Sequence, residues 1–247
     1  MTNRLHTGDL DRDEFAARVV DVADRAIVLD QTYFFGPHRL VCSDTGSIGA
    51  QRVVGLRRTR CGTLGHVVTD SEEPLPSAGD VVECHIDGLR RYRLRQLHTA
   101  QHLMEHAAEA TNELRAAAGG PVTPDSATIA LDFDGTGADL SAVTDWFAAA
   151  VRDDYSCGVT SSPAPPFGQL WHLDGYGVRQ CDAIHLPSTG GIGGVRYVAT
   201  STGPSRACVE LWVDTPHSPP EAHDCRGYES RTDVAADHRP RYTGRSA

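Results

Sequence analysis

Arg95-Gln-Leu-His-Thr-Ala-Gln-His-Leu-Met104 is the stretch of sequence that decides both the fold and the candidate site. Its apolar residues recur at helical spacing, and the pattern continues to Gly119-Gly120. We therefore predict a helix over residues 95–118 that ends at these glycines. His98 and His102 are four residues apart, so such a helix places both imidazoles on one face.

A second pair with the same spacing lies far along the chain, in Cys181-Asp-Ala-Ile-His185. The two pairs together offer three imidazoles and one thiolate, a ligand set that suits tetrahedral Zn²⁺. Each pair also fits polar residues at the edge of a core. Spacing leaves both interpretations open, although two pairs in one chain favour a metal site more than either pair alone.

Short runs of apolar and β-branched residues, separated by Gly, Pro, Ser and Asp, predict strands on both sides of this helix. The first two runs are consistent with a hairpin. Before the helix the predicted strands are 17–22, 26–30, 52–58, 64–69 and 81–86. After it we expect strands at 127–133, 169–173, 195–200 and 208–213, and a second helix at 140–152. Strands and helices do not alternate as βαβ units, so the predicted class is α+β.

Composition divides the chain into four segments. We expect a polar lead-in over residues 1–16, a mostly β subdomain over 17–90, an α+β core with the candidate site over 91–213, and a tail over 214–247. The tail has little apolar content, so burial cannot offset the entropy cost of ordering it, and disorder is predicted there.

Charge and cysteine content limit the function classes. The 247 residues carry a net charge of -10, which argues against a broad, non-specific nucleic-acid surface. Arginines cluster at 52–60 and at 90–95, and either cluster fits a solvated face or a phosphate contact. No apolar run has the length of a membrane span, the N-terminus has no secretory pattern, and the 7 cysteines are scattered. We expect a cytoplasmic protein that does not associate with membranes.

His98-Thr-Ala-Gln-His102-Leu103 resembles the His-Thr-Ala-x-His-Leu motif of the editing domain of alanyl-tRNA synthetases. The same domain occurs in free-standing AlaX-type trans-editing proteins and, in related form, in threonyl-tRNA synthetases. Cys181-Asp-Ala-Ile-His185 and the Gly-rich stretch 188–193 resemble the family's Cys-Gly-Gly-Thr-His motif and the turn after it. Weaker matches follow in the family's order at 29–32, 43–46, 65–66, 86–91 and 131–133. The resemblance runs from Ala17 to Val213.

This resemblance implies a small β-barrel-like N-terminal subdomain packed on an α+β, zinc-binding editing core. It implies that His98, His102, Cys181 and His185 bind Zn²⁺ and form the catalytic site. The implied activity is hydrolysis of the ester between a mischarged amino acid and the 3′-terminal adenosine of tRNA. The partner would be the acceptor end of an aminoacyl-tRNA and the role translation fidelity; the oligomeric state stays open.

Departures from the family pattern concern the amino-acid pocket. Val41 falls where the family has a glutamine, and Ala183-Ile184 replaces Gly-Thr. A more apolar pocket would shift selectivity from serine or glycine toward threonine or a fluorinated threonine. The candidate substrate-binding residues are Thr32, Val41, Asp44, Ile184 and Arg206. Thr32 and Asp44 also fit turn or capping roles, and Arg206 also fits a surface ion pair.

Two other functions stay open from the sequence. The first is a non-catalytic module that binds aminoacyl-tRNA or an amino acid. The second is a metallohydrolase of a small-molecule ester. His38 and His106 lie near the site motifs, and we expect the first to be an exposed loop residue and the second an exposed helix residue.

Overall fold

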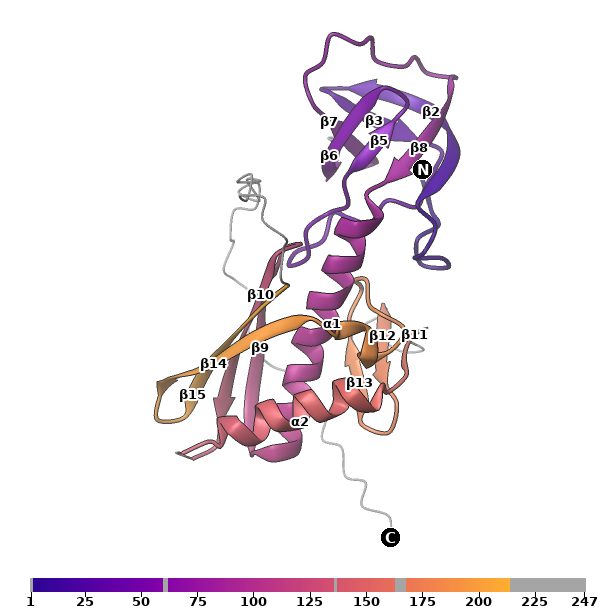
Figure 1. Cartoon of the computed structure of the whole chain (residues 1–247). Coiled ribbons are helices and arrows are strands. Elements are labelled where there is room, and N and C mark those ends of the chain that lie inside the picture. Colours follow the sequence, from indigo (N-terminus) through magenta and orange to yellow (C-terminus); the bar gives the residue numbers. More distant parts are fainter. Residues whose placement is uncertain (1, 60–61, 136, 163–167, 214–247) are drawn as a thin grey trace.

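Six strands in the first third of the chain close into a barrel (Figure 1). The structure is a computed structural model and describes residues 2–59, 62–135, 137–162 and 168–213. The barrel strands are β2 (Glu14–Ala23), β3 (Ala26–Leu29), β5 (Gly46–Ile48), β6 (Gln51–Arg58), β7 (Leu64–Val68) and β8 (Val81–Ile86). They pair in the order β2-β3-β7-β6-β5-β8. Outside the barrel, β1 (Asn3–Arg4) pairs in parallel with β4 (Gln31–Thr32).

Alternation of apolar and polar residues explains why these segments close on one another. Along β2, Phe15, Ala17 and Val19 are buried, whereas the residues between them are exposed. The predicted hairpin is confirmed, because β2 and β3 pair across Asp24 and Arg25. Both turn residues have positive φ angles, as a two-residue turn that matches the strand twist requires.

The long helix α1 (Gly88–Thr111) runs from the barrel into the second half of the molecule (Figure 1). Asp87 begins it, since its side chain accepts a hydrogen bond from the amide of Arg90. The helix therefore starts seven residues before the predicted Arg95 and ends at Thr111, not at Ala118. Asn112 is already extended, at φ -142 and ψ 166, and stops the helix there.

The segment predicted as the end of this helix is instead the edge strand β9 (Leu114–Val122). Pairing with β10 (Ser126–Phe133) overrides the helix propensity of its alanines. Gly119 and Gly120 lie inside β9 and do not stop a helix. They allow close packing, because a Cβ at Gly119 would lie 2.8 Å from the Gln101 side chain and one at Gly120 2.1 Å from that of Thr128.

The second half of the chain forms two further sheets around α1 (Figure 1). One has the order β14-β15-β10-β9, and the other has the order β11-β12-β13. The remaining elements are α2 (Leu140–Asp153), β11 (Cys157–Ser161), β12 (Gln169–Leu173), β13 (Gly177–Gln180), the short 3₁₀ helix η1 (Thr189–Ile192), β14 (Val195–Gly203) and β15 (Arg206–Val213). The second predicted helix and the four predicted strands of this half are confirmed, whereas β11 and β13 were not predicted.

One apolar core lies between α1, α2 and the four-stranded sheet, and a separate core fills the barrel. Leu97 and Leu103 of α1 meet Phe147 of α2 and Ile129 of β10 in the first core. This arrangement confirms the α+β class and the barrel. Among the described residues, no helix is both long enough and apolar enough to cross a membrane. The predicted tail over 214–247 lies outside the described residues.

A buried ion pair joins the barrel to α1. Arg91 of α1 is 3% exposed and donates to the Asp44 carboxylate through Nε, with an N···O distance of 3.1 Å. Asp44 is fully buried and also accepts from the amide of Phe35 at 2.7 Å. The Arg91 guanidinium further donates to the carbonyls of Leu10 and Tyr33. One buried cation thus ties the N-terminal segment and the segment after β4 to the helix.

We predict that Asp44→Ala lowers the free energy of unfolding by about 3–5 kcal/mol, because it leaves the Arg91 charge buried without its partner. Chemical denaturation at neutral pH measures this loss. Asp132→Ala is the matched control, since Asp132 pairs with the exposed Arg206 and its loss should leave the midpoint nearly unchanged. Equal effects of the two substitutions would contradict the prediction.

Candidate metal centre

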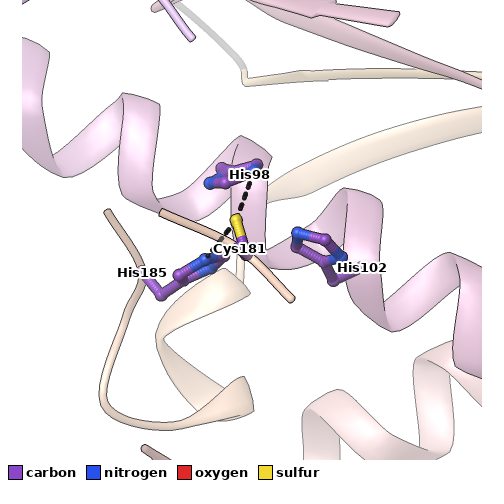
Figure 2. Close-up of side chains that lie close together, drawn as sticks. All are labelled: His98, His102, Cys181 and His185. Atoms are coloured by element: carbon purple, nitrogen blue, oxygen red, sulfur yellow. Dashed lines mark hydrogen bonds between the residues drawn. The ribbon is translucent and has the colours of Figure 1, made fainter. Parts of the chain in front are cut away.

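The four residues of the two predicted pairs meet between α1 and the segment that precedes η1. Figure 2 shows His98 and His102 on the helix, with Cys181 and His185 facing them from the other side. One potential ligand atom from each residue lies within 4.8 Å of the others. The Cys181 Sγ is 3.6 Å from His98 Nε2 and 3.2 Å from His185 Nε2. Two segments about eighty residues apart therefore form one cluster.

The two S···N distances fit the geometry of a tetrahedral zinc site. With Zn–S near 2.3 Å and Zn–N near 2.0 Å, neighbouring S and N ligands lie about 3.5 Å apart. His102 Nε2 is buried, and it has no hydrogen-bond partner among the described residues. A buried imidazole nitrogen without a partner is costly, and coordination of a cation would satisfy it. The residues present therefore fit a metal ion.

Hydrogen bonding and burial put the histidines in the form that a metal requires. His98 Nδ1 lies 3.1 Å from the carbonyl oxygen of Ile184 and donates to it, which leaves Nε2 with a free lone pair. Burial is the main cause that holds the pKa of His98 well below its usual value, and the neighbouring His102 lowers it further. Burial also lowers the pKa of His185, together with His98 and His102. Both imidazoles are neutral at neutral pH.

The Cys181 thiol is protonated in the absence of a metal. Burial raises its pKa to about 11, although a backbone hydrogen bond from Ala183 opposes the rise. Metal coordination requires the thiolate, so binding would release a proton. The affinity of the site should therefore increase with pH.

Side chains of α1 hold the segment that carries His185. The Arg95 Nε donates to the His185 carbonyl at 2.8 Å, and Thr99 Oγ1 accepts from the amide of Leu186 at 2.9 Å. Gln96 donates to the carbonyl of Gly191 at 3.1 Å. The same helix therefore supplies two candidate ligands and positions the backbone of a third.

Trp171 of β12 closes one side of the cluster. Its ring is fully buried and stacks on His102 with centroids 5.2 Å apart and an interplanar angle of 25°. It also packs at 5.4 Å from His185. These contacts restrict the planes of two imidazole rings, one from α1 and one from the segment 181–185.

The candidate substrate-binding residues lie in different surroundings. Thr32 of β4 is buried against the barrel, where its hydroxyl lies 2.9 Å from Nε2 of His66 in β7, and Asp44 pairs with Arg91. Arg206 has a 65% exposed side chain that pairs with Asp132 at 2.7 Å. The surface ion pair expected as the alternative for Arg206 is present, whereas Thr32 and Asp44 make buried contacts within the fold. A substrate-binding role for the three residues stays a prediction.

Val41 and Ile184 share one apolar core cluster with Cys181, and each is 1% exposed. Ile184 also supplies the carbonyl that orients His98. Ile184 therefore lies directly beside a candidate ligand, whereas Val41 is placed by its bridge to Val122 of β9.

Two expectations about neighbouring histidines are wrong. His106 is 4% exposed and packs on Trp171 with centroids 5.8 Å apart, because β12 covers this face of α1. His38 is half-buried, and its Nδ1 accepts hydrogen bonds from the amides of Leu40 and Val41. Both are built into the fold.

The second arginine cluster, at 90–95, is largely buried. Arg91 and Arg95 are 3% and 8% exposed and bind carbonyl and carboxylate groups of the chain. Arg90 is partly buried and donates to the carbonyl of Ser43. These three contacts favour a structural role over phosphate binding for this cluster.

Sequence analysis missed Trp171 and Glu105, whose carboxylate lies 3.7 Å from His102 Nδ1. The spacing of Glu105, three residues after His102, was a usable signal. Trp171 gave none, because its contact with the histidines arises only from tertiary packing.

No protein-family model matches the chain. The chain is 37% identical over 106 residues to the alanyl-tRNA editing protein AlaX-M of Pyrococcus horikoshii, which covers 43% of the chain and 48% of AlaX-M. It is 35% identical over 115 residues to the alanine–tRNA ligase of Natronomonas pharaonis, covering 43% of the chain and 12% of the ligase. The corresponding ligase of Halorubrum lacusprofundi is 30% identical over 228 residues, covering 81% of the chain and 24% of the ligase.

The fold and the site define an α+β protein with a closed barrel and a His₃Cys group that can hold a metal ion. The comparisons confirm the resemblance to AlaX-type alanyl-tRNA editing proteins and to the synthetases that share their domain. The matched stretch spans about half the length of AlaX-M and a smaller share of each ligase.

We predict that zinc raises the thermal unfolding midpoint of the chelator-treated protein and that His98→Ala abolishes the rise. Loss of one of four ligands should weaken zinc binding by on the order of 100-fold or more. Differential scanning fluorimetry with and without zinc measures the shift. His85→Ala, at a 53% exposed side chain on the barrel, should keep it. A zinc-induced rise that survives His98→Ala would place the metal elsewhere.

Proposed function

We propose that this protein is a zinc-dependent aminoacyl-tRNA deacylase that acts in trans on the acceptor end of a mischarged tRNA. The observation that carries the proposal is the His₃Cys group between α1 and the segment 181–185. Similarity to a protein named for alanyl-tRNA editing supports the choice of substrate class. The proposed reaction is hydrolysis of the ester between the amino acid and the terminal ribose.

The chemistry demands little of the protein beyond placement. An aminoacyl ester is already labile, so the site must position a water molecule and stabilise the developing oxyanion. Zinc, when bound, supplies a Lewis acid that can lower the pKa of a water molecule or hold the amino group or ribose of the substrate. The chain itself contributes neutral imidazoles in fixed orientations and a site from which most water is excluded.

The accessibility of the four side chains indicates the side from which substrate would approach. His98 and His185 are 4% and 3% exposed, whereas the His102 side chain is 15% exposed and Cys181 is 9% exposed. A substrate would therefore be least obstructed if it approached from the side of His102 and Cys181. Trp171 covers the ring faces of His102 and His185 on which it packs, so approach across those faces is blocked.

Selectivity is proposed to come from two apolar residues of the core that also contains Cys181. Val41 and Ile184 present no polar group where the family has a glutamine and a threonine. An apolar wall favours a side chain that carries a methyl group or a halogen, because it buries apolar surface that serine and glycine lack. We infer that threonine or a fluorinated threonine is preferred over serine or glycine.

We predict rapid ester loss from one member of a panel of tRNAs charged with alanine, serine, glycine, threonine and a fluorinated threonine. Release of labelled amino acid measures the rate. Cys181→Ala removes a candidate ligand and should lower the rate by on the order of 100-fold or more. Cys157→Ala is the matched control, a partly buried thiol outside the cluster. No turnover across the panel by folded, zinc-loaded protein would favour a binding module or a small-molecule esterase.

We predict that Val41→Gln moves selectivity toward seryl-tRNA, since an amide in the pocket can bind the serine hydroxyl. The ratio of kcat/KM for seryl-tRNA to that for threonyl-tRNA should rise by on the order of 10-fold. Val198→Gln, at a 49% exposed position on β14, is the control for the added amide. An unchanged ratio in Val41→Gln would overturn the selectivity argument and leave the deacylase proposal intact.

A further inference from the structure

A carboxylate lies beside His102 on the side away from the cluster. Glu105 follows His102 by three residues on α1, and its Oε2 lies 3.7 Å from His102 Nδ1. The other carboxylate oxygen is 3.2 Å from Nε of Arg179, which extends from β13. The Glu105 side chain is 22% exposed, so the surrounding protein shields it substantially from water.

The same arrangement recurs one turn along the helix. Glu109 lies 3.7 Å from His106 Nδ1, and its carboxylate also pairs with Arg179. His102 and His106 both pack against the ring of Trp171. Two histidine–carboxylate pairs thus share one arginine and one tryptophan. Only His102 belongs to the group that can hold a metal.

The orientation of His102 depends on a side chain, in contrast to that of His98. His98 donates through Nδ1 to a backbone carbonyl, which no substitution removes. The only carboxylate recorded beside His102 Nδ1 among the described residues is that of Glu105. The Nε2 atom of His102 is buried and has no hydrogen-bond partner among the described residues. A carboxylate on the far nitrogen of a metal-binding imidazole fixes the tautomer and makes the ring a better ligand.

We propose that Glu105 is a positioning residue that keeps the proton of His102 on Nδ1 and directs the lone pair of Nε2 at the metal. Arg179 holds the Glu105 carboxylate in place from β13. The present 3.7 Å is longer than a hydrogen bond, so this role requires the Glu105 carboxylate to move closer to Nδ1 in the metal-bound protein. This inference rests on the metal site of the proposed function and does not depend on deacylation.

The inference is tested by the zinc affinity of the full-length protein. This affinity is measured by competition with a chromophoric chelator at neutral pH. Glu105→Ala should weaken zinc binding about 10–100-fold, the usual cost of losing such a partner. Glu105→Gln should weaken it less, since its amide oxygen still accepts from Nδ1–H without the negative charge. Glu109→Ala is the matched control: it removes an equal charge and another contact of the same Arg179, beside a histidine outside the cluster.

Circular dichroism and thermal unfolding of the zinc-free variants report whether each one folds. Should Glu105→Ala not fold, Glu105→Gln carries the test, because it has nearly the same shape. Wild-type affinity in the Glu105 variant that folds overturns the inference. An equal loss in Glu109→Ala also overturns it, since the effect would then come from Arg179. Failure of the wild type to bind zinc overturns both the metal site and this inference. Zinc binding without deacylation contradicts only the proposed function.

Discussion

The rest of the structure depends on one constraint. The polar side chains that α1 carries into the interior must each find a hydrogen-bond or charge partner there. The helix buries Arg91, Arg95, His98 and Thr99, and none can be desolvated without a partner. Asp44 neutralises Arg91, and the carbonyls of Ile184 and His185 accept from His98 and Arg95. The barrel and the segment 181–186 are thus attached to the helix by hydrogen bonds as well as by apolar packing.

The candidate metal centre is a consequence of this attachment. The hydrogen bonds that place the carbonyls of Ile184 and His185 against α1 also bring the His185 ring 4.3 Å from that of His98, centroid to centroid. Cys181 lies four residues before His185, directly after β13, so the same attachment also brings its thiol to the cluster. A ligand set drawn from two distant segments therefore needs little further adjustment, which favours a preorganised site.

His102 and His106 show how position alone separates two similar residues. Both lie on α1, both have a carboxylate three residues later, and both pack on Trp171. His102 faces Cys181 and His185, whereas His106 lies one turn beyond them and meets β12 and Arg179. Local sequence cannot distinguish them, since the difference is which segment the rest of the fold places opposite each ring.

Sequence by itself determined the α+β class, five of the six barrel strands, α2 and the four candidate ligands, because alternation, helical spacing and the paired motifs are local patterns. The short barrel strand β5 was not predicted, since its three residues carry no such pattern. Tertiary structure decided the rest. Residues 114–118 have helix-forming composition but pair with β10 as a strand, and Gly119-Gly120 allow close packing there. Burial of His106, the internal use of Arg91 and Arg95, and the contacts of Trp171 and Glu105 with His102 depend on residues far apart in sequence, which no local pattern records.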